Sequence, residues 1–153
     1  MFGKPYADYI RYQMPLLVAI LVVGLLRLVL STAGQPNSVV KYVSMTVVAL
    51  VGVVYYGLRV GPSGFGGYKQ LLPLIFNQAV IANGIAILGI GVSAMGLPNI
   101  YDAPEFRGPG GGPDTSPLAH AMAHLFIGTT VGTLVSRALG CLVMRVAGRP
   151  PRK

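Results

Sequence analysis

The chain reads MPLLVAILVVGLLRLVLSTA at residues 14–33, an apolar run in which Arg27 is the only charged residue. About 20 helical residues rise about 30 Å, which matches the hydrocarbon core of a bilayer. A secretory signal peptide is the alternative, because Lys4 and Arg11 precede the run and small residues end it. Arg27, however, lies where the apolar core of a signal peptide would be. We therefore expect a membrane-spanning helix that is kept in the mature protein.

Three further apolar runs follow, at residues 39–58, 71–97 and 117–144. Overall, 53% of the residues are hydrophobic and 10% are charged, whereas soluble domains carry about a quarter charged residues. The connections between the runs are short, so consecutive helices must lie side by side and antiparallel. We predict an all-α membrane protein: a four-transmembrane-helix bundle in which residues 1–153 form a single domain surrounded by lipid.

Basic residues divide unequally between the two sides that this topology defines. The side that holds both termini carries Lys4, Arg11, Arg59, Lys69, Arg137, Arg145, Arg149, Arg152 and Lys153. The opposite side carries Lys41, Arg107 and Arg27, and its longest loop is residues 98–116. Because Lys and Arg favour the cytoplasmic side, we expect both termini, including a basic tail at 145–153, to be cytoplasmic, in a bacterial inner membrane. The net charge of +8 is too scattered to predict nucleic-acid binding.

The fourth run contains small residues at every fourth position: Gly128, Gly132, Ser136 and Gly140. Gly128 and Gly132 form a GxxxG motif, which allows two helix backbones to approach closely. Two interpretations stay open for this small-residue ridge. It packs against another helix of the same chain, or it contacts a second copy or a partner subunit in a larger membrane complex.

Ionisable residues inside the runs indicate one candidate site. Arg27 and His124 each lie about seven residues from the non-cytoplasmic ends of their runs, and His120 is one turn nearer that surface. With Asp102 and Glu105 of the long loop, they predict an outward-facing site for a ligand or a proton. The alternatives are that Arg27 extends to the lipid headgroups and that the histidines only hydrogen-bond the loop. Asn77, Gln78 and Asn83 do not share one stripe, so for them we expect interhelical hydrogen bonds.

Metal or haem chemistry has weaker support. His120 and His124 are spaced to bind one metal ion from a single helix face, but Ala121 occupies the position of the glutamate that a zinc protease requires. Haem would need a further ligand, because these are the two histidines of the chain. The single cysteine, Cys141, excludes an internal disulfide. We therefore expect no cofactor.

No stretch of the sequence carries a catalytic motif, so we assign no catalytic residue. The function that we favour is a non-enzymatic structural or accessory subunit, which assembles through the small-residue ridge. A small channel or transporter that uses the Arg27 and histidine site is the first alternative. A metal- or haem-binding redox component is the second.

Overall fold

A computed structural model describes residues 1–104 and 115–147 of the chain. Its helices are α1 (Tyr6–Thr32), α2 (Asn37–Val40), α3 (Met45–Arg59), α4 (Tyr68–Ala94), α5 (Pro117–Met122), a π-helix η2 (Ala123–Gly128) and α6 (Thr129–Val146). No strand occurs in the described ranges. Four segments, 6–32, 37–59, 68–94 and 117–146, are long and apolar enough to cross a membrane. The predicted all-α class with four apolar helices is confirmed.

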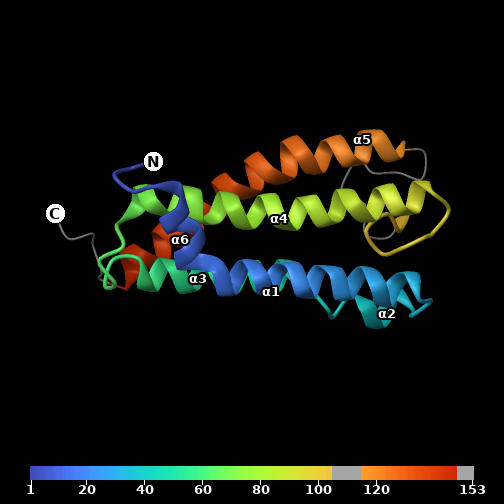
Figure 1. Cartoon of the computed structure of the whole chain (residues 1–153), viewed down its shortest axis with the longest axis horizontal. Helices are drawn as coiled ribbons and strands as arrows, with labels where there is room; N and C mark the ends of the chain where they lie inside the picture. The colour runs from blue at the N-terminus through green and yellow to red at the C-terminus, as the bar shows by residue number, and fades with distance from the viewer. Residues whose placement is uncertain (105–114, 148–153) are drawn as a thin grey trace.

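The first two helical segments depart from the predicted runs. α1 begins at Tyr6, well before the apolar run, and its first turns lie at an angle to the rest of the helix (Figure 1). Pro15 lies inside α1 and removes one backbone hydrogen bond, which favours such a bend. The second apolar segment is interrupted between α2 and α3, where the Ser44 side chain caps α3 by accepting a hydrogen bond from Val47 N at 3.4 Å.

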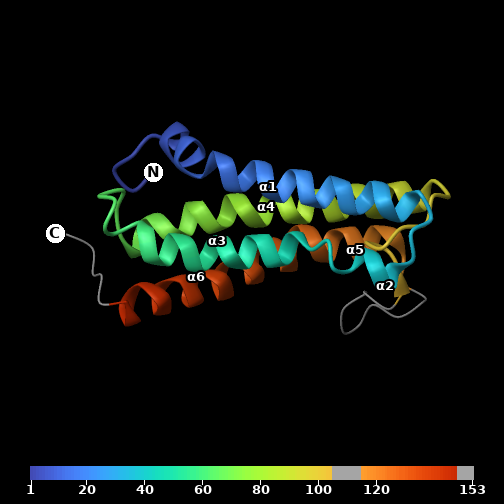
Figure 2. The same ribbon diagram turned by 90° about the horizontal axis from the view of Figure 1, so that it is seen from below.

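α4 is the central helix of the bundle. It packs against α1 on one side and against η2 and α6 on the other, while α3 contacts α1, α4 and α6 (Figures 1 and 2). In the apolar window of α4, 44% of the residues are buried, compared with 11% for the segment 117–146. Polar side chains of α4 therefore lie where neighbouring helices can reach them.

The two ends of the bundle have different cores. At one end, which we call the tyrosine end, α1 begins and α6 ends (Figure 1). There Phe65 packs edge-on against Tyr9 at 5.3 Å and stacks on Tyr12 at 4.0 Å between ring centroids. At the other end, the histidine end, residues 98–104 fold back onto α1 and α4 and bring Ile100 and Tyr101 into a second apolar cluster.

The outer faces of the helices carry large apolar side chains that no part of the described chain covers. Examples are Val22, Val29, Val51, Ile127 and Val135, each more than half exposed. A contiguous apolar surface of this kind is unfavourable in water and favourable against acyl chains. The length and composition of the four segments thus fit a membrane location.

Candidate functional site

The two histidines lie on one face of the fourth segment. Pro117 occupies the first turn of α5, and the Ser116 side chain accepts a hydrogen bond from Ala119 N at 3.2 Å, so the helix begins just before His120. His124 follows four residues later, at the start of η2. The centroids of the two imidazole rings are 5.1 Å apart, and the ring planes are tilted by 44°. The two rings are therefore neighbours inside the histidine end.

His120 is held by Asp102. Its Nδ1 lies 3.0 Å from Asp102 Oδ1, and the two residues are only 8% and 9% exposed. An ionised carboxylate can only accept a hydrogen bond, so Nδ1 of His120 carries the proton in this contact. Nε2 is then the basic nitrogen of the neutral ring, and an imidazolium formed there would be paired with the carboxylate.

His124 is held by Asn83 of α4. Its Nδ1 lies 2.9 Å from Asn83 Oδ1, while Asn83 Nδ2 donates to Ala79 O at 2.9 Å. The second bond fixes the orientation of the amide, so Oδ1 accepts from Nδ1–H and Nε2 of His124 is again the basic nitrogen. This is one of the interhelical hydrogen bonds that the sequence predicts, and the bond from Tyr6 Oη to Asn77 Oδ1 at 2.7 Å is another.

The π-helix η2 brings His124 against Asn83. A π turn adds a residue to the helical repeat and so changes the direction of the side chains beside it, a feature often found at functional sites. Thr129 Oγ1 donates to His124 O at 3.2 Å. Gly128 ends η2, and a Cβ there would overlap with Asn83 Oδ1. No motif in the sequence predicts this turn, although Gly128, its last residue, was singled out for close packing.

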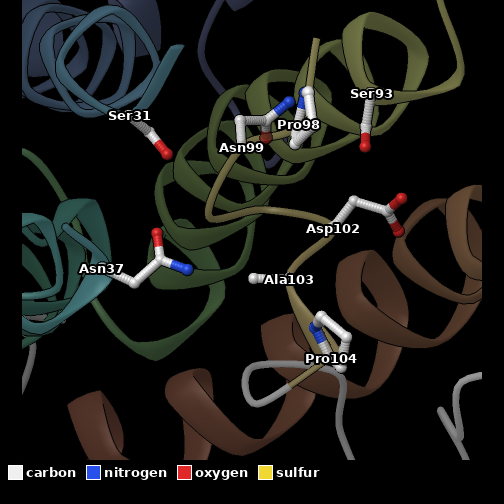
Figure 3. A pocket seen from close by; sticks show the side chains of 8 residues that line it. All are labelled: Ser31, Asn37, Ser93, Pro98, Asn99, Asp102, Ala103 and Pro104. Atoms are coloured by element: carbon white, nitrogen blue, oxygen red, sulfur yellow. The ribbon is translucent and has the colours of Figure 1, made fainter. Parts of the chain in front are cut away.

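A pocket of about 270 Å³ opens beside Asp102 at the histidine end (Figure 3). Its polar lining comes from separate elements: Ser31 of α1, Asn37 of α2, Ser93 of α4, and Asn99 and Asp102 of the loop. The loop is held in place because Ile100 N donates to Ser31 Oγ at 2.8 Å and Asn99 Nδ2 donates to Gly89 O at 2.7 Å. Asp102 thus belongs both to this pocket and to the histidine pair.

Arg27 has a different neighbour. Its guanidinium lies over the Tyr101 ring, 5.2 Å from the centroid, and Tyr101 Oη donates to Gly24 O at 2.9 Å. Burial raises the pKa of Tyr101 to about 12, an effect that the Arg27 guanidinium partly opposes. The structure therefore brings Asp102, His120 and His124 together with Asn83, and places Arg27 against the loop that carries Asp102. Glu105 lies outside the described residues.

The small-residue ridge faces α3 and α4 of the same chain. Gly128 lies against Asn83 of α4, and a Cβ on Gly57 of α3 would lie 2.8 Å from Gly140 O. Gly132 and Ser136 line a space between α3, α4 and α6. Within the described part of the chain, the ridge therefore serves close approach between helices of one copy.

His120 and His124, the candidate metal ligands, are not joined by enough further ligands to form a metal site within the described residues. Across residues 1–104 and 115–147, no three side chains of the types His, Cys, Asp or Glu lie close enough together to hold a metal ion. Comparison of the chain with family models, with curated proteins and with solved structures finds no match.

Proposed function

We propose that this protein conducts protons across a membrane, with the histidine end on the non-cytoplasmic side and both termini in the cytoplasm. The unequal distribution of Lys and Arg supports this orientation. One observation supports the function above all others: Asp102, His120, His124 and Asn83 form a continuous series of side-chain contacts that runs from the loop pocket into the helix bundle.

Histidine suits this role because its ordinary pKa lies close to neutral pH, so Nε2 of the ring can bind a proton and release it again. A proton from the loop pocket binds Nε2 of His120, and Asp102 stabilises the resulting imidazolium. A water molecule between the rings accepts the Nε2 proton of His120 and gives one of its own protons to Nε2 of His124, which becomes an imidazolium. His120 returns to its neutral Nδ1–H form, ready for the next proton.

The surroundings of the site also favour a functional role. Ionisable groups inside apolar helices are unfavourable unless they are paired, and in membrane proteins they commonly mark ion and proton pathways. A single bond from His120 to the loop would be enough to hold the loop in place. The second histidine, with its own amide partner on α4, adds a titratable group deeper in the bundle that loop attachment does not require.

Proton flux into liposomes tests the proposal. The purified protein is reconstituted with a pH-sensitive dye inside the vesicles, and a potassium diffusion potential drives proton entry. We expect the wild type to acidify the lumen and His124→Phe to fall to the rate of protein-free liposomes, because phenylalanine keeps the ring and loses both nitrogens.

Thr130→Val is the matched control. Thr130 lies on the exposed side of the same segment and its hydroxyl bonds to Phe126 O of its own helix, so its loss should leave flux unchanged. Wild-type liposomes that acidify no faster than empty ones would contradict the proposal. Full flux by His124→Phe would show that protons take another route.

Assembly with further subunits is a second proposal. It is supported by the low burial of the segment 117–146, of whose apolar window only 11% is covered within the chain. Because the small-residue ridge faces inward, a partner would pack on the opposite face, where Leu134 and Val135 are exposed. The mass of the complex in mild detergent tests this proposal, and a monomeric mass would contradict it.

A further inference from the structure

A second space between helices lies farther from the histidine end than the histidine pair does, and it is partly open at the outer face of the bundle. It is a cavity of about 160 Å³ bounded by α3, α4 and α6. Most of its lining residues are apolar. The polar ones are Gln78, Ser136 and Thr46, of which Thr46 is exposed, and Gly132 contributes backbone alone. One water molecule takes up about 30 Å³ in the liquid, so a space of this size has room for several.

Gln78 has no hydrogen-bond partner in the described chain. The residue is 2% exposed, and neither Nε2 nor Oε1 is within hydrogen-bond reach of another described group. A buried polar atom that is left without a partner destabilises the fold. The amide carries both donors and an acceptor, so it needs a partner that can accept and donate at one place.

Water meets this requirement better than the other candidates. None of the residues that line the cavity is charged, so an ion that entered it would have no counter-charge. An acyl chain would leave both ends of the Gln78 amide without a partner. A small group of water molecules can instead bond to Gln78 and to the hydroxyls of Thr46 and Ser136.

We propose that this cavity is a water-binding site, and that its water accepts the proton that Nε2 of His124 releases, while Asn83 only orients the His124 ring. This second role rests on the proton conduction proposed above. The position of the cavity supports it. Ala79 lines the cavity and its carbonyl oxygen binds Asn83 Nδ2, while Gly132 lies one turn beyond Gly128, which packs on the same Asn83 side chain.

Polar groups continue beyond the cavity toward the tyrosine end. Asn77, the neighbour of Gln78 in sequence, is buried and accepts a hydrogen bond from Tyr6 Oη at 2.7 Å. Tyr6 is 53% exposed. Asn77 directly precedes Gln78 of the cavity in sequence, and its partner Tyr6 is exposed. The pair formed by Asn77 and Tyr6 therefore connects the level of Gln78 with the surface at the tyrosine end.

Gly132→Leu is the decisive variant. A Cβ at Gly132 would meet no atom within 4 Å, so the larger side chain has room to extend into the cavity and exclude water. Gly84→Leu is the matched control, because Gly84 of α4 is equally open around its Cβ position but is exposed and does not line the cavity. Gln78→Leu is a second variant, which removes the polar group and keeps a side chain of similar length.

Two measurements are made on each variant in lipid bilayers. The first is magnetisation transfer from water to the side-chain amide of Gln78 in ¹⁵N-labelled protein in nanodiscs, assigned from the signal that Gln78→Leu lacks. The second is the liposome proton flux described above. We expect the wild type, His124→Phe and Gly84→Leu to show the water signal, and Gly132→Leu to lose it. Gly132→Leu and Gln78→Leu should also lose flux, which Gly84→Leu should keep.

The two proposals fail in different ways. A wild-type Gln78 amide that receives no magnetisation from water, or receives it from lipid acyl chains instead, would overturn the water site. Full flux by Gly132→Leu together with lost flux by His124→Phe would overturn the onward role of the cavity and leave the histidine pathway intact. A water signal without any wild-type flux would support the water site and overturn proton conduction.

Discussion

The two polar regions inside the bundle satisfy their hydrogen bonds in opposite ways. In the histidine region, His120 and His124 each bond to a side chain of another element, Asp102 and Asn83. In the cavity region, Gln78 is more deeply buried than either histidine but bonds to no described group. The Nδ1 atoms of both histidines are thus paired within the protein, whereas the Gln78 amide has no protein partner, and we propose that water supplies one. The same kind of substitution, an amide replaced by leucine, should therefore change the stability of the protein by different amounts in the two regions.

The largest difference in stability is expected between Asn83→Leu and Gln78→Leu. Asn83→Leu leaves Nδ1–H of His124 buried without its acceptor, which should lower the free energy of unfolding by about 2 kcal/mol. Gln78→Leu removes an amide that has no protein partner, so the change should stay below about 1 kcal/mol. Denaturant unfolding in detergent micelles measures both. Equal losses for the two variants would mean that Gln78 has a protein partner after all.

Alanine substitutions at the two glycines of the GxxxG motif, Gly128 and Gly132, should change the stability of the protein in opposite directions. Gly128→Ala places a Cβ against Asn83, whose Oδ1 it overlaps and whose Cγ lies 3.1 Å away, and this should destabilise the protein by about 1–2 kcal/mol. Gly132→Ala meets no atom within 4 Å and should stabilise the helix by up to about 1 kcal/mol, the difference in helix propensity. Thermal unfolding of the two variants checks this contrast. Destabilisation by Gly132→Ala would show that its surroundings are closed.

A smaller effect is expected at Tyr101, where the loop meets α1. Tyr101→Phe loses the hydrogen bond to Gly24 O, worth about 1 kcal/mol, but keeps the ring under Arg27. The ordinary pKa of tyrosine is 10.0 and burial raises that of Tyr101 to about 12. The unfolded chain therefore loses this proton first, so the contribution of Tyr101 to stability is present below pH 10 and declines toward pH 12.

Unfolding of the wild type and of Tyr101→Phe between pH 8 and pH 12 measures this contribution. The stability difference between the two proteins should shrink as the pH rises above 10. A constant difference over the whole range would contradict the assigned burial of the hydroxyl.

Much of the fold could be predicted because it depends on local composition. Each apolar run is long enough to form a helix that spans a bilayer, whatever its neighbours are. The bend at the start of α1 and the break before Ser44 depend on how the turns pack and on individual caps, so the hydropathy pattern alone does not give them. The sequence also does not predict which helix packs on the small-residue ridge, because a GxxxG motif indicates a close contact but not the helix that makes it.

The candidate site could be predicted only in part. The position of the long loop and the depth of the two histidines predict that His120, His124 and Asp102 share one end of the bundle, since depth follows from counting residues along a helix. The position of Asn83 opposite His124 depends on the rotation of α4 and on the π turn, neither of which the sequence specifies. Arg27 has the same depth as His124 but lies on another helix, and depth alone does not say that its neighbour is Tyr101.

The proton pathway through the histidine pair is tested most directly by its current across a planar bilayer with a pH difference between the two sides. If protons carry the current, the reversal potential should shift by about 59 mV for each pH unit, and His124→Phe should abolish the current. No current above that of a protein-free bilayer, or a reversal potential that follows the gradient of potassium or chloride instead, would contradict the pathway.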